Sequence, residues 1–262
     1  MSKRSNAEKA IERLTRPERI RIAKAKIKKV LDHFLYLIEL HANNSFVVFS
    51  PVLASQIPRS LAANAFDVFQ RSMYQIEVVR LCAIWDSIDV DKENIPTVVE
   101  LIDDDGIIEM LAGEARIPYL NGAGGGLINP SEYDSRRGFE QEMTKKINLQ
   151  FADEHASTAR AELRQAIADT RSVLGSERLS SIMNLRDKHL AHSLETTRRE
   201  KEGPVQPMKY GDETKLLDAS IPIVERLYCW VYGSGFSIKK AQKIDQDYAD
   251  ALWASCKFVD PR

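Results

Sequence analysis

The apolar residues of this chain recur at three- and four-residue intervals over long stretches, which is the pattern of helices that bury one face. A first helix is predicted to begin near Arg16-Pro17, because proline is tolerated in the first helical turn. Its apolar stripe comprises Ile20, Ile27, Val30, Leu31, Phe34, Leu37 and Ile38. Residues 43–58 are expected to form a connection, and further helices are predicted over residues 59–86, 96–102, 139–174, 177–199, 214–232 and 238–258. The sequence contains no convincing set of strands and no internal repeat, so we predict an all-α bundle.

The clearest break in this pattern is the segment NGAGGGLINPSEYDSRRG, from Asn121 to Gly138, which is predicted to be a mobile loop. A phosphate-cradling loop is the alternative, but the run lacks a Lys-Ser/Thr ending and a preceding strand. The predicted division is an N-terminal helix and connection over residues 1–58, and a helical core over residues 59–200 with the loop insertion at 121–138. C-terminal helices over residues 201–262 are expected to pack on that core.

The charges are balanced overall but unevenly distributed along the chain. The 262 residues carry a formal net charge of -1, so overall charge does not indicate a nucleic-acid binder. Residues 1–29 contain 11 Lys/Arg against 3 Asp/Glu, whereas residues 86–114 contain 1 Lys against 10 Asp/Glu. This asymmetry indicates either a polyanionic partner at the basic end or docking of the two segments within the fold or a dimer.

The cysteines and histidines outside one short segment give no sign of a metal or cofactor site. The three cysteines are widely spaced within apolar segments, which fits a reducing cytosol: Cys82, Cys229 and Cys256. Three histidines have no second ligand cluster nearby and are expected to be structural or exposed: His33, His41 and His155. The N-terminus lacks the apolar region of a secretion signal, and no segment is apolar enough to span a membrane. We therefore expect a cytoplasmic protein with no cofactor, no metal and no membrane association.

The segment NLRDKHLAHS, from Asn184 to Ser193, concentrates the side chains that can carry chemistry. Within seven positions it contains Arg186, Asp187, Lys188, His189 and His192, a group that would be costly to bury. Histidine titrates near pH ~6.5 and can donate or accept a proton at neutral pH. Arginine stays charged and presents a fork of donors to phosphate oxygens. Together these groups can transfer protons and bind a phosphate without a metal.

The residues around this segment resemble a known family. An Arg, then a polar residue, then a His four to six positions after the Arg is the motif of the HEPN superfamily. The run RDKHLAH, Arg186 to His192, resembles the RNK-x-LAH form of abortive-infection (Abi U-type) HEPN proteins, and RLCAIWD, Arg80 to Asp86, is similar to the helix that precedes it in them. The resemblance covers roughly residues 59–199 and implies a HEPN-like helical bundle, here with additional N- and C-terminal helices and the Gly-rich insertion. It also implies RNA cleavage that leaves a 2′,3′-cyclic phosphate.

The spacing of the motif poses a geometric problem. Arg186 and His192 are six positions apart, about 240° around a regular helix at roughly 100° per residue, so they do not share a face. Either the helix is distorted there, or a site is assembled from two chains. The resemblance implies the second solution, a two-fold homodimer with its interface near the motif. We expect Arg186 and His192 to be catalytic, Asp187 to orient a His or polarise the site, and Lys188 and His189 to hold RNA.

The function predicted from the sequence is a metal-independent endoribonuclease of the toxin or phage-defence type. Its predicted partners are RNA, a second copy of the chain, and an antitoxin or another defence subunit. Two alternatives stay open. One is a non-catalytic HEPN-like module that binds RNA or nucleotide or supports a partner enzyme. The other is a helical scaffold in which Arg186 pairs with Glu195 or Asp187 and has no further role.

Overall fold

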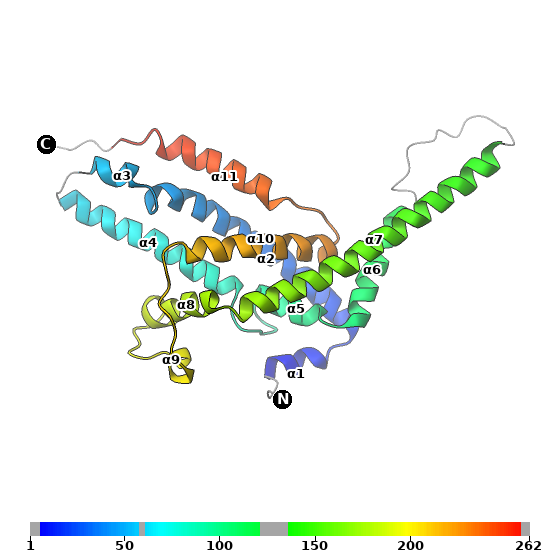
Figure 1. Ribbon diagram of the computed structural model, residues 1–262, viewed down its shortest axis with the longest axis horizontal. Coiled ribbons are helices and arrows are strands. Elements are labelled where there is room, and N and C mark those ends of the chain that lie inside the picture. The colour runs from blue at the N-terminus through cyan, green and yellow to red at the C-terminus, as the bar shows by residue number, and fades with distance from the viewer. Residues whose placement is uncertain (1–5, 58–60, 121–135, 258–262) are drawn as a thin grey trace.

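The structure is a computed structural model that describes residues 6–57, 61–120 and 136–257, and these residues form helices and connecting segments with no strand. The predicted all-α fold is therefore confirmed (Figure 1). The elements are α1 (Asn6–Glu12), α2 (Arg16–Val47), α3 (Pro51–Gln56), α4 (Leu61–Ile84), α5 (Ile95–Ile102), α6 (Asp105–Leu120), α7 (Arg136–Leu174), α8 (Glu177–Leu185), the π-helical turn η1 (Arg186–Leu190), α9 (Arg198–Glu202), α10 (Asp212–Leu227), the π-helical turn η2 (Tyr228–Tyr232) and α11 (Ile238–Trp253).

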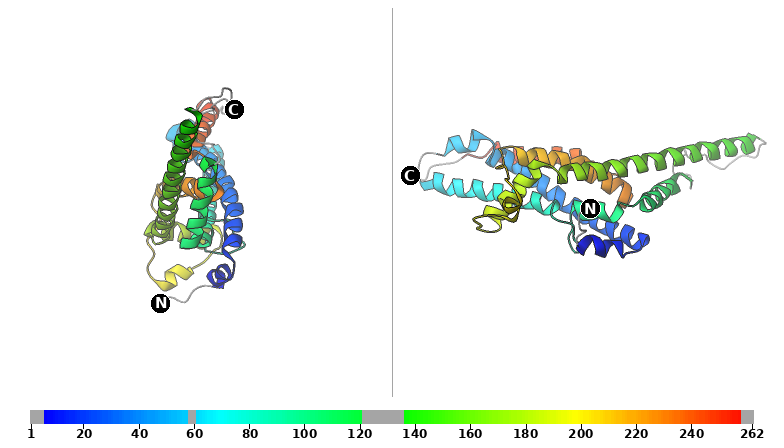
Figure 2. Two further views of the ribbon diagram at one scale, coloured as in Figure 1. Left: turned by 90° about the vertical axis from the view of Figure 1, so that its right-hand side faces the viewer. Right: turned by 60° about the horizontal axis from the view of Figure 1, so that its bottom comes forward.

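Helix α2 is the central element of the fold. It begins where the sequence predicts, because the Glu18 carboxylate accepts hydrogen bonds from the Thr15 backbone N–H at 2.8 Å and from the Thr15 hydroxyl at 2.6 Å. Its apolar stripe is buried and packs against α4, α5, η2 and α11. The two long helices α2 and α4 run beside each other through the body of the molecule, and the first half of α7 projects from that body (Figures 1 and 2).

One hydrophobic core joins residues from all parts of the described chain, from Ile11 to Ile238. Trp85, near the end of α4, is fully buried in it, and its indole N–H donates to the Ser220 hydroxyl of α10 at 2.9 Å. This bond satisfies the buried donor that makes Trp expensive to bury. It also fixes the end of α4, where Asp86 follows directly. The division into residues 1–58, 59–200 and 201–262 stays a prediction.

Several predicted boundaries are wrong. The connection over residues 43–58 contains the end of α2 and all of α3, because Ser50 caps α3 by accepting from the Val52 N–H at 3.2 Å. Helix α6 occupies a region for which no helix was predicted. The helix over residues 177–199 ends its regular part at Leu185. The Gly-rich segment lies outside the described residues over 121–135, while residues 136–138 begin α7.

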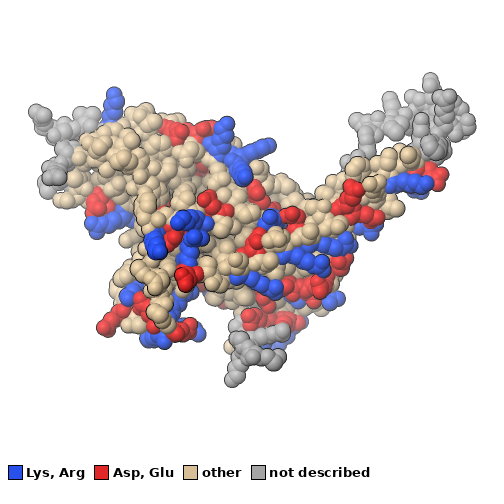
Figure 3. Space-filling model, in the orientation of Figure 1, with Lys and Arg blue, Asp and Glu red and all other residues tan. Residues whose placement is uncertain are grey.

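The basic segment over residues 1–29 and the acidic segment over residues 86–114 contact each other within the fold. Arg16 of α2 pairs with Asp104 at 2.8 Å, and Lys24 pairs with Glu114 at 2.5 Å. The Arg19 guanidinium donates to the carbonyls at the end of α5, those of residues 100 and 101, at 2.8 and 2.9 Å. Figure 3 shows basic and acidic side chains intermixed along α7 and around α9. These contacts support docking of the basic segment on the acidic one.

Among the described residues, no helix combines the length and the apolar character required to cross a bilayer.

Candidate active site

The predicted motif lies on a distorted helix. Helix α8 is regular from its Ser176 cap, which accepts from the Leu179 N–H, to Leu185. The chain then widens into η1, where the Ala191 N–H donates to the Arg186 carbonyl five residues back at 2.8 Å. Single π-helical turns of this kind are frequently found at functional sites. The helix is therefore locally distorted at the motif, which is one of the two conditions that the spacing of Arg186 and His192 allowed.

Arg186 is held by carboxylates on both sides. Its Nε and one terminal nitrogen donate to the same Asp187 oxygen at 2.8 and 2.6 Å, and its other terminal nitrogen lies 3.9 Å from Asp86. Burial alone would lower the pKa of Arg186, but the Asp187 hydrogen bonds and the nearby acidic groups raise it above its ordinary value. The side chain is 19% exposed, so it is fixed in place yet still reachable from solvent.

The end of α4 forms one wall of the site. Burial would raise the pKa of Asp86, but the Ser87 backbone N–H at 2.8 Å, Lys92 and Arg186 together hold it below its usual value. Cys82 lies one turn earlier and is fully buried, and its burial raises the pKa of the thiol to about 12. The thiol therefore stays protonated and makes a long contact of 3.8 Å with the Ile182 carbonyl.

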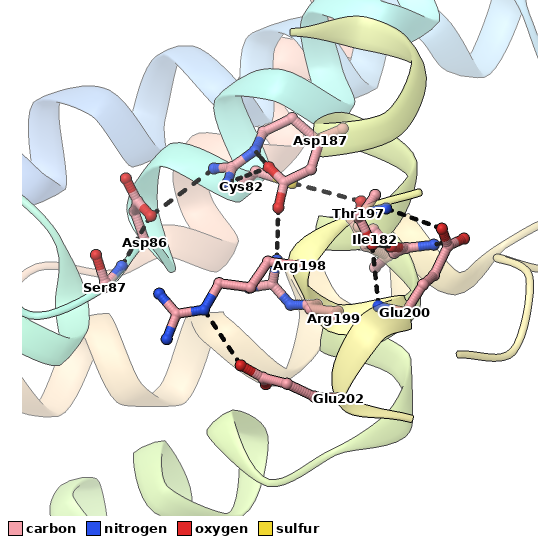
Figure 4. A network of polar contacts seen from close by, with 12 residues as sticks. Cys82, Asp86, Ser87, Ile182, Asp187, Thr197, Arg198, Arg199, Glu200 and Glu202 are labelled. Atoms are coloured by element: carbon pink, nitrogen blue, oxygen red, sulfur yellow. Dashed lines mark hydrogen bonds and ion pairs between the residues drawn. The ribbon is translucent and has the colours of Figure 1, made fainter. Parts of the chain in front are cut away.

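Helix α9 forms the opposite wall. Arg199 donates to the second Asp187 oxygen at 2.6 Å, so this carboxylate bridges two arginines (Figure 4). Asp187 was expected to orient a His or polarise the site, and in the structure its partners are Arg186 and Arg199. Glu200 accepts from Lys188 at 2.8 Å and from Asn184 at 3.0 Å, and these contacts, with the Thr197 N–H, lower the pKa of Glu200 to about 2. Two carboxylates thus tie the π turn to α9.

The two histidines of the motif differ from Arg186 in being exposed. His189 lies on η1, whereas His192 follows the end of the turn, in a non-helical segment. Within the described residues, no hydrogen bond or ion pair joins His192 to Arg186 or to any other side chain. The structure therefore brings Arg186, Asp187 and Lys188 into one polar network and leaves both imidazoles open to solvent.

Three members of the network were not predicted as site residues. Asp86 was quoted only as part of the resemblance. Arg199 was the last residue of the helix predicted over residues 177–199, and Glu200 lay just beyond it. A signal for the last two was present in the sequence, because Thr197 and Glu200 have the spacing of a capping box. That spacing marks the start of α9 and hence the turn that brings Arg199 back to Asp187. The described residues contain no group of three His, Cys, Asp or Glu placed to hold a metal ion.

Comparison with known proteins gives one match. A family model for the HEPN group described as AbiU2 matches residues 23–252, which is most of the chain and includes the whole polar network. No significant match was found among curated proteins or among solved structures.

Proposed function

Because this chain belongs to the AbiU2 family of HEPN proteins, an abortive-infection family, we propose that it is a metal-independent endoribonuclease of the toxin or phage-defence type. In this proposal RNA is the substrate, and cleavage proceeds by attack of a 2′-OH on the adjacent phosphate. The observation that carries the proposal is the fixed, partly exposed guanidinium of Arg186 on a π-helical turn, three to six residues before two open imidazoles.

The chemistry assigns each residue a task. The attack requires one proton to be removed from the 2′-OH and one to be given to the leaving 5′-oxygen, and the phosphate gains negative charge between these steps. His192 is proposed to carry one of these protons, since its exposed ring is free to meet substrate. Arg186 is proposed to stabilise the charged phosphate. Asp187 and Asp86 keep its fork in one orientation, which reduces the ordering that substrate binding requires.

A homodimer would supply the second imidazole. Helix α4 exposes an apolar stripe that includes Val68, Ile76 and Val79, and the last of these lies five residues before the helix ends at Ile84. Large apolar side chains in a row on a solvent-facing helix favour association. Pairing of this stripe with its two-fold copy would bring the two motifs toward one another, because α4 packs directly against η1.

The partner and the location are part of the same proposal. A toxic ribonuclease has to be restrained in the cell that makes it, so an antitoxin or another defence subunit is the expected partner, and the cytoplasm is the expected location. Neither is needed for the biochemical test of the activity.

The test is incubation of purified protein with total RNA in EDTA. Wild type should fragment the RNA, and both His192→Ala and Arg186→Lys should leave it intact, because the lysine keeps the charge but loses the fork. His33→Ala is the matched control, since the His33 side chain is also open to solvent, at 41% exposed, but lies on α2 beside Glu93. Cleavage by His192→Ala at the wild-type rate would exclude the proposal. If wild type and His192→Ala both bind RNA but neither cleaves it, the non-catalytic module is favoured.

A further inference from the structure

A cavity of about 510 Å³ lies beside the motif. Its lining includes Asn184, Lys188 and His189 from the end of α8 and the π turn, and also Phe49, Tyr74 and residues of the non-helical segment 205–210. Small-molecule sites commonly measure about 300–1,000 Å³, so this cavity has room for one nucleobase with its ribose. Arg186 is not among the lining residues, and its own contacts are to Asp187 and Asp86.

The cavity is lined by an aromatic cluster. The ring of Phe49 meets Tyr74 edge to face at 6.3 Å and Tyr210 edge to face at 5.5 Å. Tyr210 is 75% exposed, so most of this ring has no packing partner in the described chain. Unstacked bases of single-stranded RNA bind proteins mainly by stacking on aromatic rings of this kind.

Polar groups border the same cavity. Lys188 and His189 come from the motif, and Glu200 holds the Lys188 ammonium at 2.8 Å. The backbone N–H groups of Val205 and Met208 have no hydrogen-bond partner among the described residues, although both residues line the cavity. A base entering here would meet donors at its edge and a ring at its face.

We infer that this cavity binds one unstacked base of single-stranded RNA and thereby places the adjacent phosphate on Arg186. The inference rests on the proposed function and adds its substrate class, an RNA whose bases are not paired. Only Asp187 separates Lys188, which lines the cavity, from Arg186 in the chain, so the proposed base site and the proposed phosphate site are both formed by the same π turn. A base within a duplex is stacked on both faces and cannot enter a cavity of this size.

The test uses the non-cleaving His192→Ala protein and a single-stranded oligoribonucleotide that carries one 2-aminopurine, whose fluorescence falls when it stacks. Binding should quench the fluorescence. An added Tyr210→Ala change should weaken binding about tenfold and remove the quenching, because stacking on one ring contributes on the order of this factor. Tyr210→Phe keeps the ring and should bind like the parent. Tyr248→Ala is the matched control, since Tyr248 is 70% exposed but does not line the cavity.

Each of these binding comparisons tests the base site without depending on whether the protein cleaves RNA. Equal binding by Tyr210→Ala and Tyr248→Ala would overturn it, whether or not wild type cuts RNA. Duplex RNA bound as tightly as the single strand would also overturn it, and so would a free mononucleotide bound as tightly as the oligonucleotide. If wild type proves unable to cleave RNA but the Tyr210 series behaves as expected, the base site stands and only the nuclease assignment fails.

Discussion

The pair formed by His41 of α2 and Glu77 of α4 allows a sharp test of how the two central helices are joined. The His41 Nδ1 lies 2.6 Å from the Glu77 carboxylate, which is only 1% exposed and also accepts from the Asn44 amide. Removing one partner of a buried ion pair costs about 3–5 kcal/mol, because a charge is left buried without compensation. His41 is itself partly exposed, so the lower end of the range applies.

We therefore expect His41→Ala to lose about 3 kcal/mol, which lowers Tm by roughly 6–12 °C for a chain of this size. His41→Gln keeps a donor for Glu77 without the charge and should lose about 1–2 kcal/mol. The assay is thermal unfolding followed by circular dichroism at 222 nm. The matched control is His33→Ala, whose ring lies 3.3 Å from Glu93 on the exposed surface.

The pH dependence of Tm in wild type and the His41 variants provides a second test of this pair. Burial alone would lower the pKa of His41, but the Glu77 hydrogen bond and charge raise it above its ordinary value of 6.5. The stabilisation is therefore complete below about pH 6.5 and is lost as pH rises through the folded pKa. The Tm difference between wild type and His41→Gln should therefore become smaller as pH rises from about 6.5 through the folded pKa of His41. A loss no larger than that of His33→Ala, or a difference that grows with pH, would refute the reasoning.

Three further predictions concern the site and its surface. Asp187→Asn should cost about 1–2 kcal/mol in thermal unfolding, because the new amide NH₂ faces the Arg199 donor; an unchanged Tm would mean that this bridge contributes nothing. Val79→Asp should convert the expected dimer to a monomer in light scattering, whereas Val52→Asp, at a more exposed valine on α3, should not; identical masses for the two variants would reject the α4 interface. Cys82 should resist alkylation at pH 8 until the protein unfolds, since its thiol is buried with its pKa raised to about 12; rapid labelling of the native protein would contradict this.

The sequence predicted the long helices well and the short elements poorly, for physical reasons. Helices α2 and α4 bury one stripe against the core, so their apolar residues repeat at helical intervals. Residues 43–58 were predicted to form a connection, although Pro51 stands at the start of α3, where proline is compatible with a helix. Helix α6 contains acidic residues, Gly113 and Pro118, and its stability comes partly from ion pairs with α7, such as Arg160 with Glu109 at 2.8 Å. Such long-range partners cannot be inferred from local periodicity.

The sequence singles out the segment from Arg186 to His192, but the geometry of this segment could not be derived from the sequence. The dense polar run from Arg186 to His192 identified the segment, and the spacing of its ends indicated a distorted helix or a shared site. Contact between Arg186 and its neighbour Asp187 was expected only in the scaffold alternative, because adjacent residues on a regular helix point in different directions. The bridge from Asp187 to Arg199 depends on the reversal of the chain between η1 and α9, which no local pattern specifies.

The central claim is that cleavage uses the RNA's own 2′-OH and the imidazole of His192. The most direct measurement compares a defined single-stranded oligoribonucleotide with the same oligonucleotide carrying one 2′-deoxy residue at the mapped cleavage site, in EDTA. Wild type should cut the first to leave a 2′,3′-cyclic phosphate and leave the second intact, and His192→Ala should cut neither. Cleavage of the 2′-deoxy linkage, or the same products from His192→Ala, would contradict the account.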